Sequence, residues 1–97
     1  MLVDNTLASA NILFVNEKII KAICNENRVK LLMCLSKSPK TVTEMISTCG
    51  LAQSAVSQHL VKLKNAGLVE NIKQGREVTY SIKKKEVAEI CNQISSL

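Results

Sequence analysis

Hydrophobic residues recur at helical spacing through most of the chain. Near the start they predict a first helix over about residues 6–24, with a wider apolar surface than a monomer of this size needs. A second helix follows, since Asn25 or Asn27 can accept hydrogen bonds from first-turn amides and cap it. The Ser38-Pro39 pair ends this helix, because the residue before a proline disfavours helical backbone. The first part of the chain is therefore predicted to hold two helices.

A short helix and a longer one come next, with a tight turn between them. The sequence Thr41-Val42-Thr43-Glu44 fits a capping box, in which Thr41 accepts from the Glu44 amide and the Glu44 side chain reaches back. Gly50 ends the short helix, and the next helix, Ala52–Asn65, begins after only about three residues. This spacing predicts a helix–turn–helix over about residues 41–66.

The helix over residues 52–65 has two different faces. At about 100° per residue, Val56, Leu60 and Leu63 fall within about 40° of one another and anchor the helix to the core. Hydroxyl and amide groups on the other face can bond to base edges in a DNA major groove, and a valine can meet a thymine methyl. A polar face of this kind also occurs on helices that meet only solvent. The outward residues are Ser54, Ser57, Gln58 and Val61, with Gln53 and Lys64 at the margin.

Two β-rich runs, Leu68–Lys73 and Arg76–Ile82, flank Gln74-Gly75 and predict a hairpin over about residues 68–82. Lys73 and Arg76 lie at its tip, where they can reach phosphates or a minor groove. A last helix from about Lys84 places five apolar residues on one face: Val87, Ile90, Cys91, Ile94 and Leu97. The pattern predicts one mainly α domain over residues 1–97, with about five helices and a β-hairpin wing.

The distribution of charge points to the same third of the chain. The net charge is +5, and residues 53–85 hold seven Lys or Arg against two Glu. A localised basic patch favours a polyanion such as duplex DNA, although Lys-rich helix faces are often only solvated. One Tyr, one Phe and no Trp exclude proteins that grip single-stranded bases by aromatic stacking.

The four cysteines form no Cys-x-x-Cys motif and lie within helical apolar patterns, which favours reduced core residues over a disulfide scaffold. The N-terminal residues lack the basic start and continuous apolar run of a secretory signal. No stretch is apolar for long enough to predict a membrane span. We therefore expect a cytoplasmic protein with no membrane contact.

Three stretches, KAICNENRVKLL, GLAQSAVSQHLVKLKNAGLV and KQGREVTYSI, resemble the ArsR/SmtB family of winged-helix regulators. The middle stretch is most similar to the HlyU-like branch, which has no evident metal site. The resemblance implies a homodimer held by the first and last helices, with paired recognition helices in successive major grooves of a palindrome. It also implies a role for each matching residue. Gln53, Ser54, Ser57 and Gln58 would read bases or position phosphates, His59, Lys62 and Lys64 would flank them, and Lys73 and Arg76 would serve the wing.

The chain departs from the family pattern at several positions. Ala52 stands where relatives place a capping Ser, and Ile72 replaces a common wing Arg. Arsenic and cadmium sensors of the family carry Cys-x-Cys where this chain has Thr41-Val42-Thr43. Zinc and cobalt sensors use Asp and His at the start of the last helix, where this chain has Lys84 and Glu86. We therefore expect no metal and no cofactor.

The sequence thus predicts a dimeric, non-enzymatic transcriptional regulator, in the role of a repressor, that binds palindromic duplex DNA. A winged-helix module that docks a protein partner is the alternative, because a fold does not fix a function. A thiol-responsive regulator of the same fold is another, since related sulfur-responsive proteins pair a second-helix Cys with one in the last helix. Cys34 and Cys91 are the nearest counterparts, and core packing is the simpler role for both. For His59, the only histidine, phosphate contact and plain packing both remain open.

Overall fold

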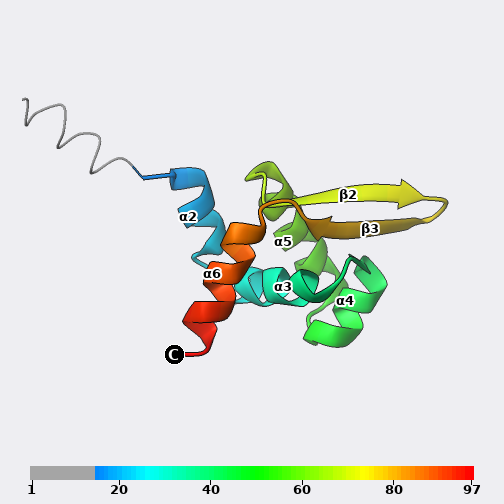
Figure 1. The fold of residues 1–97 in the computed structure, drawn as a ribbon. Coiled ribbons are helices and arrows are strands. Elements are labelled where there is room, and N and C mark those ends of the chain that lie inside the picture. The colour runs from blue at the N-terminus through cyan, green and yellow to red at the C-terminus, as the bar shows by residue number, and fades with distance from the viewer. Residues whose placement is uncertain (1–14) are drawn as a thin grey trace, which may run out of the picture.

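The computed structural model describes residues 15–97, which form five helices and a three-stranded sheet (Figure 1). The predicted class, a mainly α winged helix–turn–helix, is confirmed. The helix expected over 6–24 lies partly outside the described residues. Within them, α2 (Glu17–Ile23) begins only after Asn16, whose backbone is extended. The Asn16 side chain caps the helix, because its Oδ1 accepts a hydrogen bond from the Ile19 amide at 3.1 Å. The expectation of continuous helix is therefore wrong at residues 15 and 16, because an asparagine there competes for the helix amides.

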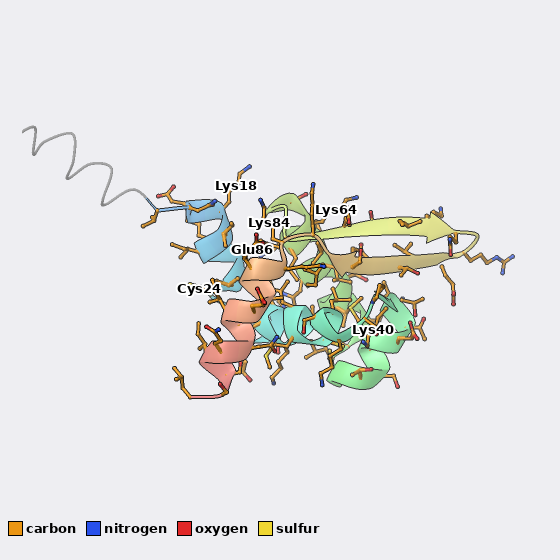
Figure 2. All side chains as sticks on the ribbon, in the orientation of Figure 1. Lys18, Cys24, Lys40, Lys64, Lys84 and Glu86 are labelled. Carbon is orange, nitrogen blue, oxygen red and sulfur yellow. The ribbon has the colours of Figure 1, made fainter. Side chains whose placement is uncertain are left out.

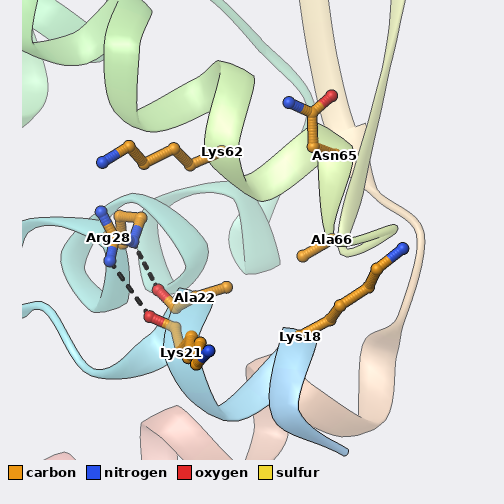
Figure 3. Close-up of a pocket in the computed structure, with 7 residues that line it drawn as sticks. All are labelled: Lys18, Lys21, Ala22, Arg28, Lys62, Asn65 and Ala66. Atoms are coloured by element: carbon orange, nitrogen blue, oxygen red, sulfur yellow. Dashed lines mark hydrogen bonds between the residues drawn. The ribbon is translucent and has the colours of Figure 1, made fainter.

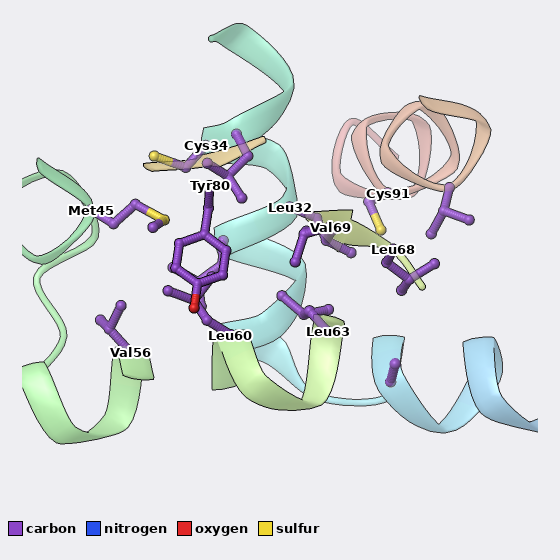
Figure 4. Close-up of a cluster of buried hydrophobic side chains, with 14 residues drawn as sticks. Leu32, Cys34, Met45, Val56, Leu60, Leu63, Leu68, Val69, Tyr80 and Cys91 are labelled. Atoms are coloured by element: carbon purple, nitrogen blue, oxygen red, sulfur yellow. The ribbon is translucent and has the colours of Figure 1, made fainter. Parts of the chain in front are cut away.

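The second helix has the predicted cap and end. α3 (Glu26–Lys37) begins after Asn25, whose side chain accepts from the amides of Asn27 and Arg28 at 2.9 and 3.1 Å. It ends at Ser38, immediately before Pro39. α3 supplies four buried residues and passes through the middle of the hydrophobic core, where Figure 4 shows side chains from the other elements around it.

The helix–turn–helix consists of α4 (Val42–Cys49) and α5 (Gln53–Asn65). The predicted capping box is present, since Glu44 Oε1 accepts from the Thr41 amide at 2.8 Å and Thr41 Oγ1 accepts from the Glu44 amide at 3.1 Å. Gly50 ends α4 with a φ of 69°, a left-handed conformation that glycine adopts without strain. Ala52 precedes α5 and provides no side-chain cap, so α5 starts one residue later than predicted.

The hairpin pairs β2 (Val69–Gln74) with β3 (Glu77–Ile82) in antiparallel register, from Val69 opposite Ile82 to Gln74 opposite Glu77. The two-residue turn is therefore Gly75-Arg76, one position beyond the predicted Gln74-Gly75, because Gln74 still pairs across the ladder. Gly75 has the expected positive φ, at 64°. This shift places Arg76 in the turn itself, at the free end of a hairpin that projects from the helices (Figure 1).

A third strand was not predicted. β1 (Lys40–Thr41) pairs with β3, with Lys40 opposite Tyr80 and Thr41 opposite Thr79. Since Thr41 is also the N-cap of α4, this pairing fixes the start of the helix–turn–helix against the wing. The position of the wing relative to α4 is therefore set by backbone hydrogen bonds as well as by side-chain packing.

α6 (Lys85–Ser95) closes the chain and divides the apolar residues predicted for one face into two groups. Val87 and Cys91 are buried against the core, as is Ala88, which was not predicted for this face. Ile90, Ile94 and Leu97 are instead exposed, at 48%, 57% and 103% of their accessible surface. α6 and α2 lie at the end of the molecule opposite the hairpin tip (Figure 1). An apolar strip is thus left uncovered there.

Candidate nucleic-acid interface

α5 has the two faces expected of it. Val56, Leu60 and Leu63 are completely buried, which anchors the helix on the core. The predicted contact residues Gln53, Ser54, Ser57 and Gln58 are all exposed, as are Lys62 and Lys64, and Val61 is 53% exposed. The helix therefore presents hydroxyl, amide and cationic groups on a rigid support, which is the arrangement that reading base edges requires.

A surface groove of about 400 Å³ brings part of this face together with the wing. Gln53 and Ser57 of α5 line it with Arg76 of the hairpin turn, although these residues lie far apart in the sequence. Thr41 and Thr43 line it from the start of α4, and sequence reasoning missed them. The capping box could have identified them, because it places hydroxyl groups at the end of α4 that faces the wing.

The other predicted contact residues lie outside this groove. Ser54 and Gln58 are exposed on the same helix, and Lys73 is exposed on β2, opposite Val78. Lys64 lies near the C-terminal end of α5, on the side of the molecule that also carries Lys18 and Lys84 (Figure 2). Cationic groups are thus present at both ends of α5.

Few acidic side chains lie near the cations of α5 and the wing. Within residues 15–97 the one ion pair joins Lys30 to Glu26 on α3. Glu77 is the only acidic residue that lines the groove, beside Arg76. The wing tip and the α5 cations therefore keep most of their positive field, which attracts phosphates and weakens as salt screens it.

Arg28 of α3 contacts both α2 and α5 and so joins the three helices. Its guanidinium donates to the carbonyl oxygens of Ala22 and Lys21, the latter at 3.1 Å, which satisfies the C-terminal end of α2 (Figure 3). Its Nη1 lies 3.4 Å from Nδ1 of His59 on α5. A pocket of about 340 Å³ beside this junction is lined by Lys18, Lys21, Ala22, Arg28, Lys62, Asn65 and Ala66.

The structure thus places His59 against Arg28, so its ring packs toward α3 while its neighbour Gln58 is exposed. Since guanidinium only donates, the Nδ1 atom of a neutral His59 is the acceptor and its proton is on Nε2. Burial, together with the charges of Arg28 and Lys62, lowers the pKa of His59 below its usual 6.5. A proton on His59 would place a second cation beside Arg28.

Acid is therefore expected to destabilise the protein through His59. The unfolded chain binds a proton near pH 6.5, whereas the folded chain resists it until a lower pH, so stability falls as pH drops through 6.5 toward the folded pKa. Urea titrations at steps from pH 7.5 to pH 5.5 should show this loss as a falling midpoint.

The variant His59→Gln separates this effect from other titrations and should show a flatter profile over the same range. Glu44 does not interfere, because its hydrogen bonds with Thr41 lower the pKa of its carboxyl below 4.5. A profile for His59→Gln as steep as that of the unsubstituted protein would contradict this assignment.

The two cysteines considered for a thiol pair are not neighbours. Cys34 and Cys91 lie on opposite sides of the buried cluster in Figure 4, and their side chains are 8% and 1% exposed. All four cysteines are free thiols.

Among residues 15–97, no group of three or more His, Cys, Asp or Glu side chains is arranged to hold a metal ion. None of the helices described is both long and apolar enough to cross a membrane.

Comparison with known proteins agrees with this geometry. The family model for "Bacterial regulatory protein, arsR family" matches residues 25–71. The chain is 39% identical to the transcriptional activator HlyU of Vibrio cholerae over 71% of this chain and 64% of HlyU. It is 36% identical to the HTH-type transcriptional regulator YgaV of Escherichia coli, over 71% of each protein.

The fold is also that of a solved relative. The crystal structure of HlyU from Vibrio vulnificus superposes with a TM-score of 0.73 at 33% identity, covering 96% of this chain and 93% of that one. The match with the Vibrio cholerae HlyU sequence spans less than two thirds of that protein's length. Family model, relatives and fold agree that the chain belongs to the ArsR family of bacterial regulatory proteins.

Proposed function

We propose that this protein is a transcriptional regulator that binds palindromic duplex DNA as a homodimer, in the cytoplasm, and that it has no catalytic role. The observation that carries the proposal is the groove in which Gln53 and Ser57 meet Arg76 of the wing. It combines groups that read bases with a cation that neutralises phosphate, and both kinds of contact are needed for specific binding. The names of HlyU and YgaV, a transcriptional activator and a transcriptional regulator, support the same function.

The size and shape of the elements suit a DNA duplex. α5 has 13 residues and an exposed polar face, and an α-helix fits the major groove. The hairpin projects beside it and carries Arg76 at its tip, so it reaches the backbone or the adjoining minor groove. In this arrangement Thr43, at the start of α4, donates its hydroxyl to a phosphate oxygen at the rim of the groove.

The homodimer rests on the uncovered apolar residues of the two terminal helices. Ile90 and Ile94 of α6 are exposed, as is Leu97 after it, and Val15 and Ile20, before and within α2, are 50% and 42% exposed. Apolar surface concentrated at one end of a small protein marks an interaction site. A twofold contact through this end leaves both hairpins and both α5 helices free for DNA.

Selection from a pool of random duplexes tests the function even when the operator is unknown. The full chain is expected to enrich an inverted repeat whose half-sites are centred about 10 base pairs apart, because two α5 helices related by a twofold axis enter successive major grooves. Bound promoters in the genome should then contain that repeat. Enrichment of no common sequence after repeated rounds would refute the proposal.

Substitutions in the groove should separate phosphate contacts from base contacts. Arg76→Ala is expected to weaken binding to all sequences alike and to reduce the slope of log affinity against log salt by about one for each phosphate that is no longer neutralised. Ser57→Ala or Gln58→Ala should instead relax sequence preference, by about 1–3 kcal/mol of discrimination at the base read. Fluorescence anisotropy with the selected duplex and single-base variants of it measures both effects.

Lys37→Ala provides the matched control for loss of one cation. Lys37 lines a different groove, which reaches Thr48 and Cys49 at the C-terminal end of α4, whereas the DNA groove uses the N-terminal end. Its removal should leave the salt slope unchanged. Equal, sequence-independent loss in the Arg76, Ser57 and Gln58 variants would refute the division of roles.

A further inference from the structure

Two cysteines from different helices line one surface groove. Cys34 is buried in the middle of α3, and Cys49, the last residue of α4, is partly exposed. Both line the same groove, and neither is in a disulfide. Figure 4 shows the sulfur of Cys34 directed toward the side of the core where Met45 of α4 lies. The pair is therefore produced by the packing of α3 on α4.

The remaining cysteines have different surroundings. Cys91 is 1% exposed among core residues, and burial alone raises the pKa of its thiol. Cys24 follows α2 and is exposed. Cys34 and Cys49, by contrast, line the same groove, and Cys49 is partly exposed. Cys24, an exposed thiol, and Cys91, a buried one, therefore serve as controls for the reactivity of Cys34 and Cys49.

The dithiol opens into a groove of about 350 Å³ that is lined by three lysines and no acidic residue. Lys30, Lys37 and Lys40 line it together with both cysteines. Lys30 is paired with Glu26 at 2.9 Å, so Lys37 and Lys40 supply most of the positive field. Lys40 is held in place, since its Nζ donates to the carbonyl oxygen of Cys34 at 3.1 Å and to Ser38 Oγ at 3.0 Å. These charges attract an anion into the space next to the sulfurs. They also disfavour capture of a free metal cation by the thiols.

We propose that Cys34 and Cys49 are an oxidation site, at which exchange with a small anionic disulfide such as glutathione disulfide joins α3 to α4 through an intramolecular disulfide bond. The Cys49 thiolate, which is the more exposed, attacks one sulfur of the reagent, and one glutathione leaves with the proton that Cys49 gave up. The Cys34 thiolate then attacks the Cys49 sulfur and releases the second glutathione. Two protein thiols are oxidised and one disulfide is reduced to two thiols.

The electrostatics of the pair set the pH dependence of the reaction. Burial, with a smaller contribution from the neighbouring Cys34, raises the pKa of Cys49 to about 11, while Lys40 and Lys30 oppose the shift. Since the thiolate is the nucleophile, the rate should keep rising as pH increases from 7 to 9. This site is independent of DNA binding, so its test needs no operator.

Peptide mapping identifies the bond directly, because trypsin places the relevant cysteines in separate peptides. Cys34 falls in residues 31–37, Cys49 in residues 41–62 and Cys91 in residues 86–97. The full chain carrying Cys24→Ser, which removes the exposed thiol, is treated with glutathione disulfide, denatured, alkylated and digested. We expect a cross-link between the first two peptides, a chain lighter by two hydrogens, two fewer alkylated cysteines, and full recovery after dithiothreitol.

Three variants and a second reagent test the assignment. Cys49→Ser should abolish the cross-link and Cys91→Ser should preserve it. Lys37→Ala should slow exchange with glutathione disulfide about twofold and leave exchange with the neutral hydroxyethyl disulfide unchanged, because only the anion senses the missing charge. The proposal would be overturned by a cross-link to residues 86–97, or by a stable glutathione adduct on Cys49 without a cross-link. It would also be overturned if, in the unsubstituted chain, Cys24 reacted completely with glutathione disulfide while Cys34 and Cys49 both stayed unmodified.

Discussion

Replacing Leu60 with alanine is expected to lower the free energy of unfolding by about 3 kcal/mol. Leu60 lies on the inward face of α5 and has no accessible surface. Alanine removes most of its apolar contacts and leaves a cavity that the surrounding side chains fill only in part. Urea unfolding followed by circular dichroism at one fixed protein concentration measures the loss, and the thermal midpoint should fall by roughly 12–24 °C.

The neighbouring residue supplies the control. Val61→Ala changes a side chain that is 53% exposed, so stability should change by less than about 0.5 kcal/mol. The same pair distinguishes support from contact in the proposed DNA complex, because Val61→Ala removes only exposed methyl groups and leaves the buried face of α5 intact. Equal destabilisation by both substitutions would mean that the inward face of α5 is not the one assigned here.

The double substitution Ile90→Glu with Ile94→Glu is expected to raise the dissociation constant of the dimer by more than about 100-fold. The two isoleucines are about half exposed on α6, so the isolated chain tolerates a polar residue at either position. In the proposed dimer they are buried, and an unpaired carboxylate there is costly. Sedimentation at micromolar concentration should give twice the 10.6 kDa chain mass for the unsubstituted protein and the single mass for the variant.

Ile72→Glu is the matched control, since Ile72 is 61% exposed on β2, in the hairpin. It makes one Ile→Glu change of the same kind at a position far from α2 and α6, and the dimer should persist. A dimer that survives the double substitution, or an unsubstituted chain that stays monomeric, would contradict the placement of the interface.

Local signals in the sequence predicted much of this fold. The capping box at Thr41 and Glu44, the turn at Gly50 and the two faces of α5 each depend on residues within a few positions of one another. For the same reason β1 was missed, because a strand of two residues has no detectable period and exists only through its pairing with β3. The turn at Gly75-Arg76 was misplaced by one residue, since register depends on the partner strand.

The candidate site was predicted in parts. Residue type and helical spacing indicated Gln53 and Ser57, and the hairpin tip indicated Arg76, but their meeting in one groove depends on how the wing packs against α4. The contact of His59 with Arg28 and the placement of Cys34 and Cys49 in one groove are also long-range. The resemblance to sulfur-responsive relatives suggested Cys91 as the partner of Cys34, whereas the packing of α3 on α4 places Cys49 in the same groove as Cys34.

The uncapped start of α5 has a consequence for how the protein meets its ligand. Ala52 has no side-chain acceptor, so the first-turn amides of α5 have only water or the backbone of the turn as partners. These protons should exchange with solvent deuterium much faster than those near Leu60 and Leu63, because opening one turn does not disturb the core. In the proposed complex with DNA, part of the binding free energy is therefore used to hold this turn in its helical conformation.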